Sequence, residues 1–126
     1  MSPSTALAEA ITSLAATAQQ PLREGAPTTS WRWTVRQTMS AVRDALMQER
    51  AGSEDGWLAA RGGTAFRERN TLLGRLGDLG SRVLEDPDVD SLRADVRRLV
   101  SDVSRHVQRV NDLAYDEVEL ELGGSE

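Results

Sequence analysis

The chain has 126 residues, 39% of them hydrophobic and 28% charged, a balance typical of one folded globular domain rather than of a disordered segment. It contains no cysteine, which excludes a disulfide framework, a thiolate metal site and a thiol nucleophile. The net charge of −5 comes from residues 112–126, which carry six acidic residues and no basic one, so the chain lacks the basic face that a nucleic-acid partner requires.

The sequence also lacks the usual membrane and export signals. No apolar run approaches the roughly 18 residues of a membrane span. The start, MSPSTALAEA, contains Glu9 and no cationic segment of the kind that opens a signal peptide. We therefore expect a cytoplasmic protein with no membrane partner. All fifteen basic residues are arginine, a usage that suggests a high-GC bacterial genome.

Two helices are expected in the first half of the chain, over about residues 3–20 and 30–51. Pro21 ends the first helix, and Thr29 or Ser30 caps the second. Apolar residues at helical spacing mark the face of each helix that packs in a core. These residues are Leu7, Ile11, Leu14 and Ala18 in the first helix, and Trp31, Val35, Thr38 or Met39, Val42 and Leu46 in the second.

Residues 53–63 are too apolar for a bare loop, and we expect a short extra helical turn there that packs Trp57 against the bundle. A third helix follows over about residues 64–85. Its apolar period is given by Phe66, Leu73, Leu76, Val83 and Leu84, widened by Leu72 and Leu79. Three glycines interrupt this helix at intervals of three residues: Gly74, Gly77 and Gly80. Each costs roughly 1 kcal/mol relative to alanine. Either a close crossing with another helix or room beside the backbone for a ligand would explain them.

The fourth expected helix, over about residues 89–120, shows the clearest heptad pattern, and Asp88 or Asp90 caps it. Its stripe alternates steps of four and three residues along Leu92, Val96, Leu99, Val103, His106, Val110, Leu113 and Glu117. Residues 117–122 alternate acidic and aliphatic side chains like a strand, and glutamates are unfavourable at a helix C-terminus. We therefore expect the acidic tail, residues 116–126, either to fray or to lie over the arginines of a partner.

Four amphipathic helices with short connections predict an all-α protein whose architecture is an antiparallel up-down-up-down four-helix bundle. No helix with so wide an apolar stripe is stable alone in water, so the four stripes must face one another. The prediction is a single domain over residues 1–126.

His106, the only histidine, lies in the core stripe of the fourth helix. It is either a buried histidine bonded to a carboxylate or carbonyl on a facing helix, or a metal ligand or proton carrier. Metal sites in bundle cores take several histidines and carboxylates from facing helices. In the metal alternative the remaining ligands would be the carboxylates of Glu49, Glu68, Asp112 and Glu117.

A second polar group follows His106 on the same helix and comprises Asn111, Asp112 and Tyr115. Asn111 and Asp112 lie about 140° and 240° around the helix from His106, whereas Tyr115 lies within a quarter turn of it. We expect a polar core cluster that fixes the helix register. A catalytic dyad is the alternative.

The tryptophans and the acidic tail suggest a surface for a partner. Trp31 and Trp33 lie about 200° apart on a helix, so they cannot both face the core. An exposed tryptophan pair would mark an interface. The possible interaction surface therefore comprises Trp33, Trp57, Glu119 and Glu121. Acids interleave with the arginines of the fourth helix, which predicts a solvated, salt-bridged face along Arg93, Arg97, Arg98, Arg105 and Arg109.

Two segments, FRERNTLLGRLGDL (66–79) and SLRADVRRLVSDVSRHVQRVNDLAYDEVELELGGSE (91–126), resemble the last two helices of hemerythrin-like (HHE cation-binding) bundle proteins. The similar features are His106-Val107-Gln108-Arg109, Asp112-Leu113-Ala114-Tyr115 and the ending Gly123-Gly124-Ser125-Glu126. The resemblance implies an antiparallel bundle, with a non-haem iron site in the family's active members. Here the histidine of the third helix is replaced near Arg69 and that of the second near Glu49, so the resemblance implies a bundle that has lost its metal and retains His106 alone.

These observations lead to a ranked expectation for function. First comes a metal-free binding or interaction module without a cofactor, which associates with an unknown protein partner or with itself as a homodimer. The alternative is a degenerate hemerythrin-like iron protein that binds oxygen or another small diatomic molecule. An enzyme that uses His106 and Tyr115 comes last, and no catalytic motif of a known class is present.

Overall fold

The computed structural model describes the backbone of residues 3–52 and 63–124, and the side chains of residues 5–48 and 63–112. These residues form four helices, α1 (Pro3–Gln19), α2 (Thr29–Gly52), α4 (Gly63–Glu85) and α5 (Val89–Gly124), with no strand among them. The all-α prediction is confirmed. The extra helical turn expected at residues 53–63 lies, apart from Gly63, outside the described residues.

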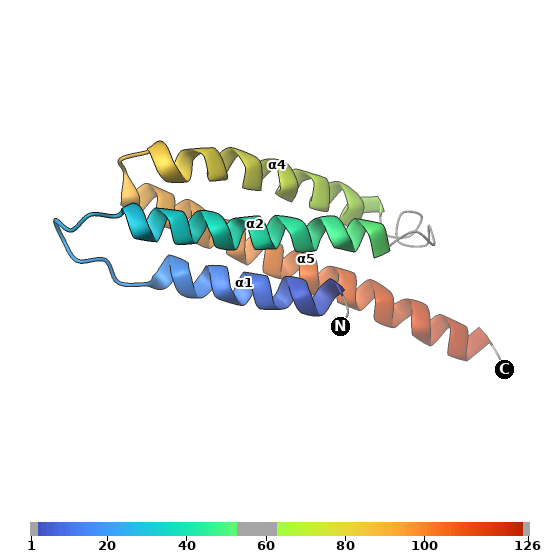
Figure 1. The fold of residues 1–126 in the computed structure, drawn as a ribbon. Coiled ribbons are helices and arrows are strands. Elements are labelled where there is room, and N and C mark those ends of the chain that lie inside the picture. Colours follow the sequence, from blue (N-terminus) through green and yellow to red (C-terminus); the bar gives the residue numbers. More distant parts are fainter. Residues whose placement is uncertain (1–2, 53–62, 125–126) are drawn as a thin grey trace.

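The helices run alternately up and down, and each packs against two neighbours (Figure 1). α1 contacts α2 and α5, and α4 contacts the same two helices from the opposite side. This closed ring confirms the up-down-up-down four-helix bundle. Among the described residues, no helix combines the length and the apolar character needed to cross a bilayer.

The bundle core follows the heptad stripes predicted for α1, α2 and α5. Leu7, Leu14, Val35, Val42 and Leu92 are among the side chains with no exposed surface. Trp31 is buried at one end of this core, where its indole Nε1–H donates to the Thr17 carbonyl over 2.9 Å. The remaining described members of the core on these helices are Ile11, Ala18, Met39, Ala45, Leu46, Val96, Leu99 and Val103.

The predicted stripe of α4 was partly wrong. Its buried residues are Ala65, Arg69, Leu72, Leu76, Leu79 and Val83, while Phe66, Leu73 and Leu84 are only half-buried. The steps of four and three along this buried set make a regular heptad row. An arginine occupies one core position of that row, and its charge is why the apolar pattern alone indicated a neighbouring face.

Two arginines close the helix ends at one end of the bundle. Arg32 donates from Nη1 to the carbonyl oxygens of Val83 (2.9 Å) and Asp86 (2.5 Å), at the C-terminus of α4. Arg93 donates from Nη1 to the carbonyls of Ala18 and Gln20, both over 2.9 Å, at the C-terminus of α1. Carbonyls in a last helical turn have no partner within the helix, so these contacts satisfy them.

The N-termini of α2 and α5 are capped by residues just outside the helices. Asp88 Oδ1 accepts the Ser91 backbone N–H over 3.0 Å, which selects Asp88 over the predicted alternative, Asp90. The first carbonyl bonded in α2 is that of Thr28, one residue before the predicted caps, and it accepts the Arg32 N–H over 2.9 Å.

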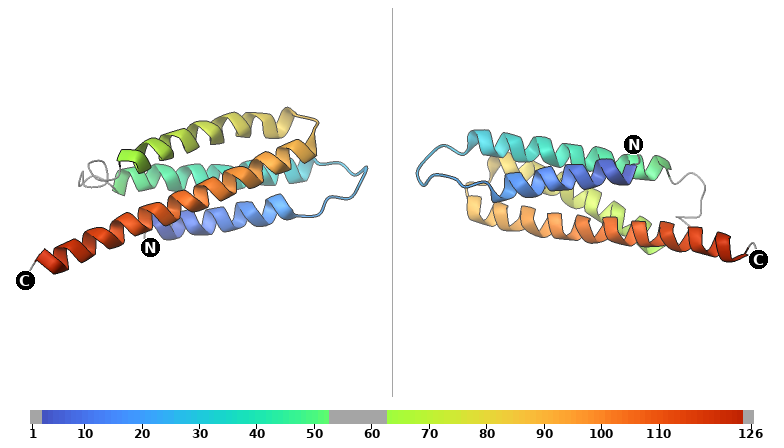
Figure 2. Two further views of the ribbon diagram at one scale, coloured as in Figure 1. Left: turned by 180° about the vertical axis from the view of Figure 1, so that it is seen from behind. Right: turned by 90° about the horizontal axis from the view of Figure 1, so that it is seen from below.

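α5 is longer than predicted, because it continues through the strand-like residues 117–122 to Gly124. The acidic tail is therefore not a separate segment up to that residue. The C-terminal part of α5 extends past the ends of the other three helices (Figure 2).

The three glycines of α4 do not serve a close helix crossing, which was the simpler of the two expectations. A Cβ atom at Gly74, Gly77 or Gly80 would meet nothing within 4 Å. Each glycine thus weakens the helix without a packing gain within the described residues, and the space beside the backbone is open.

Candidate functional site

His106 is completely buried in α5 and reaches α4, where its ring Nδ1 lies 2.9 Å from Oε1 of Glu68. The other oxygen of that carboxylate, Oε2, accepts from Nη1 of Arg109 over 2.6 Å. An ionised carboxylate only accepts hydrogen bonds, so Nδ1 carries the proton in this contact. The expectation of a buried histidine bonded to a carboxylate on a facing helix is confirmed.

Arg69 follows Glu68 on α4 and is also completely buried. Its guanidinium carbon lies 4.3 Å from the centre of the Phe66 ring, a cation–π distance. α4 and α5 run antiparallel, and the Glu68–His106 contact places position 69 at the same level of the bundle as position 106. The core thus changes at this level from aliphatic side chains, ending with Leu72 and Val103, to an arginine and a histidine.

The structure does not assemble the polar core cluster predicted around His106. Asn111 and Asp112 are exposed, and Asp112 Oδ1 accepts from the Gln108 amide over 3.0 Å. Their helical angles already turned both residues away from the core face. The side chain of Tyr115 lies outside the described residues.

The described residues at this level do not fit an iron site. His106 and Glu68 supply two donors, and both oxygens of Glu68 are already occupied by the His106 ring and Arg109. The neighbouring Arg69 adds a permanent positive charge that repels a cation. Across the residues whose side chains are described, no group of three or more His, Cys, Asp or Glu is placed to hold a metal ion. The side chains of Glu49 and Glu117, named in the metal alternative, lie outside this set.

Comparison of the chain with protein-family models, with curated proteins and with solved structures finds no match. The resemblance to hemerythrin-like bundles therefore stays a prediction. The geometry of the described residues is the basis for everything said below about function.

A ladder of three ion pairs joins α4 to α5 along one edge of the core. Arg82 pairs with Asp95 (2.8 Å), Arg75 with Asp102 (2.7 Å), and Glu68 with Arg109 (2.6 Å). Successive pairs are seven residues apart on each helix, and the third pair reverses the direction of the charges. Such pairs at the flanks of a heptad core fix which residues of two helices lie opposite each other. The seven-residue spacing was visible in the sequence, but we did not use it.

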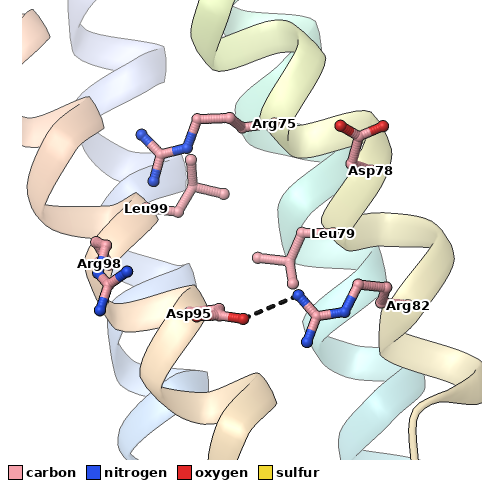
Figure 3. Close-up of a pocket in the computed structure, with 7 residues that line it drawn as sticks. All are labelled: Arg75, Asp78, Leu79, Arg82, Asp95, Arg98 and Leu99. Carbon is pink, nitrogen blue, oxygen red and sulfur yellow. Dashed lines mark hydrogen bonds and ion pairs between the residues drawn. The ribbon is translucent and has the colours of Figure 1, made fainter.

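The ladder borders a groove of about 240 Å³ between α4 and α5, in which the Arg82–Asp95 pair is visible (Figure 3). Its side chains neutralise one another. The hydrogen bond from Arg75 holds the pKa of Asp102 below its ordinary value, and the hydrogen bond to Asp95 raises the pKa of Arg82. The lining residues are Arg75, Asp78, Leu79, Arg82, Asp95, Arg98 and Leu99.

Two other grooves differ in charge from this one. The groove between α1 and α2, of about 510 Å³, is lined mainly by small residues, and its charged members are Glu9 and Asp44. The groove between α2 and α4 is smaller, about 110 Å³, and its lining contains two arginines and no carboxylate. That lining comprises Arg36, Met39, Ser40, Arg43, Leu76, Gly77, Gly80 and Ser81.

The predicted tryptophan surface is only partly placed. Trp31 is buried and Trp33 is 53% exposed, so the two do face opposite ways, as their spacing required. Met47, on the same helix, is 47% exposed. Trp57, and the side chains of Glu119 and Glu121, lie outside the described residues.

Proposed function

We propose that this protein is a helical-bundle recognition module that binds a protein partner, or a second copy of itself, through its surface and works without a metal or cofactor. The observation that carries the proposal is the layer of Arg69 and His106. Both side chains are completely buried where a bundle protein would place a bound metal. The guanidinium supplies a fixed positive charge there, and the histidine is already bonded to Glu68.

The rest of the molecule supports recognition at the surface. Below this layer, the described core is built from close-packed aliphatic side chains and Trp31. The cavities described above are open grooves between neighbouring helices, and Trp33 is exposed. We place the protein in the cytoplasm, and the absence of cysteine from the sequence agrees with a reducing compartment.

The alternative is a degenerate hemerythrin-like iron protein that binds oxygen or another small diatomic molecule. One observation favours it, namely that His106 and Glu68, two of its expected ligands, are in contact. The two functions differ in whether the metal depends on His106, and this dependence is measurable.

The test is metal analysis of the full chain purified without chelator, together with His106→Leu as a variant that cannot coordinate. We expect far less than one equivalent of iron in both proteins. We also expect no rise in the thermal unfolding midpoint when ferrous iron is added, because a ligand raises stability only by binding the folded state. Stoichiometric iron that disappears in His106→Leu would refute the metal-free proposal.

A further inference from the structure

The groove between α2 and α4 is positively charged and has no neutralising group in its lining. Arg36 and Arg43 lie two helical turns apart on α2, about 10 Å along the axis. Among the described side chains, no carboxylate pairs with Arg36. Arg43 contacts only its exposed neighbour Asp44, over 3.3 Å, and such surface pairs contribute little. Two guanidiniums on one wall therefore remain available to an acidic ligand.

The opposite wall of this groove is a helix surface stripped of side chains. Gly77 and Gly80 of α4 line it, and neither would meet any atom within 4 Å if a Cβ were added. Ser40 and Ser81 add only short side chains. A partner helix can approach this backbone more closely than it could approach a wall of larger residues, which offsets the helix stability that the glycines forgo.

The chain itself contains a segment with the complementary charge. From Asp112 to its end the sequence has six acidic residues and no basic one. Most of this segment forms the end of α5 that extends past the other helices (Figure 2). A helical segment this short is marginally stable in water without packing partners. Contact with another surface would supply that stability.

The protruding end cannot occupy the groove of its own chain. α5 is continuous to Gly124 and runs away from the bundle, whereas the groove lies on the far pair of its walls, between α2 and α4 (Figure 2). Two protruding ends would also repel each other, because both are acidic. The α1–α2 groove, whose charged members are Glu9 and Asp44, would repel them as well.

We infer that the protein forms a homodimer in which the acidic C-terminal end of α5 of each copy lies in the Arg36–Arg43 groove of the other. Each copy offers one such groove and one such helix end, so a two-fold arrangement satisfies both at once. This inference rests on the proposed surface-recognition function and specifies both the surface and the partner.

The first test is charge reversal in full-length protein, followed by light scattering over a range of concentrations. We expect wild-type protein to dimerise and to dissociate with added salt. Arg36→Glu/Arg43→Glu and Glu117→Arg/Glu121→Arg should each raise the dissociation constant by about tenfold or more. An equimolar mixture of the two variants should dimerise again, because one copy then offers an acidic groove and the other a basic helix end.

The control is Arg23→Glu/Arg97→Glu, which makes the same change in net charge at exposed positions outside the groove. It should dimerise like the wild type, apart from the general effect of net charge. Equal weakening by this control, or a mixture that fails to associate, would refute the inference.

A second test separates association from folding by using the glycines. Gly77→Ala/Gly80→Ala should raise the thermal unfolding midpoint of the monomer, because alanine favours the helix, and at the same time weaken dimerisation by filling the groove. Gly74→Ala, on the same helix but outside the groove lining, should raise the midpoint and leave dimerisation unchanged. A wild-type protein that stays monomeric at all concentrations overturns the dimer, and the metal analysis above is unaffected by that result.

Discussion

Arg69 and His106 occupy core positions where the heptad rows of α4 and α5 otherwise place aliphatic residues. Removing a guanidinium from water is costly, and the interactions it gains inside a protein often only balance that cost. The cation–π contact with Phe66 recovers part of it. These two residues therefore specify the level at which the helices align more than they contribute to stability.

Replacement of this layer by apolar residues tests that interpretation. We expect Arg69→Met/His106→Leu to be neutral or to raise the free energy of unfolding, by up to about 1–4 kcal/mol, because it extends the aliphatic core. Glu68 keeps its ion pair with Arg109 in this variant. Urea unfolding of the double variant and of each single variant measures the effect and the coupling between the positions. A loss of about 3 kcal/mol or more in the double variant would instead show a network on which stability depends.

At the scale of single residues, the sequence predicted the environment of His106 but not its partner. The heptad stripe of α5 placed His106 in the core, and a buried imidazole requires a hydrogen-bond partner. The choice of Glu68 depends on how α4 and α5 align, which the spacing within either helix does not specify. Arg69 was identified only as a residue at a former ligand position, because an arginine breaks the apolar pattern by which a core position is recognised.

The helix ends show the same dependence on neighbouring elements. Arg93 appeared in the sequence as one of a row of solvated arginines on α5, yet it caps α1 and lies over the indole of Trp31, 5.3 Å from the ring centre. Arg32 has the corresponding role for α4. Each contact joins helices far apart in sequence, so it follows only after the bundle has formed. The N-cap of α5 at Asp88, in contrast, is local and was among the two predicted residues.

Removal of the Arg93 cap should therefore be costly for an arginine at the surface. We expect Arg93→Met to lower the free energy of unfolding by about 1–3 kcal/mol, because hydrogen bonds from a charged donor to two carbonyls are lost while the aliphatic stem is retained. Arg97→Met, on an exposed position of the same helix, should change it by no more than about 0.5 kcal/mol. Chemical denaturation of both variants gives the comparison. Equal effects would show that Arg93 acts only as one more surface charge.

At the scale of the whole molecule, helix lengths and connections were enough to predict the bundle, and the boundaries of α1, α2 and α4 differ from prediction by one residue at most at each end. The extension of α5 to Gly124 was missed. Local charge disfavours a helix C-terminus rich in glutamate, and the sequence alone does not show that the helix continues beyond its neighbours. The ion-pair ladder between α4 and α5 fixes the alignment that the apolar stripes leave free.

That ladder makes stability depend on pH in a defined direction. The hydrogen bond from Arg75 holds the pKa of Asp102 below the ordinary value of 3.8. The pKa of Asp86 is lowered by the backbone N–H of Asp88 and then by Arg82. A carboxyl whose pKa is lower in the folded state contributes stability that is fully present above the unfolded-state pKa and is lost as the pH falls through the folded-state pKa. The free energy of unfolding should therefore be flat near neutral pH and should fall below about pH 4.

Asp102→Asn removes one of these titrating groups and should flatten the fall, because the variant has no proton to bind at that position in either state. Asp78→Asn is the matched control, since Asp78 lines the same groove and has no ion pair among the described side chains. It should retain the wild-type pH dependence. Urea unfolding of the three proteins between about pH 5 and pH 2 measures the slopes. Identical slopes for wild type and Asp102→Asn would mean that the Arg75–Asp102 pair adds nothing to stability, and that the apolar core alone aligns α4 with α5.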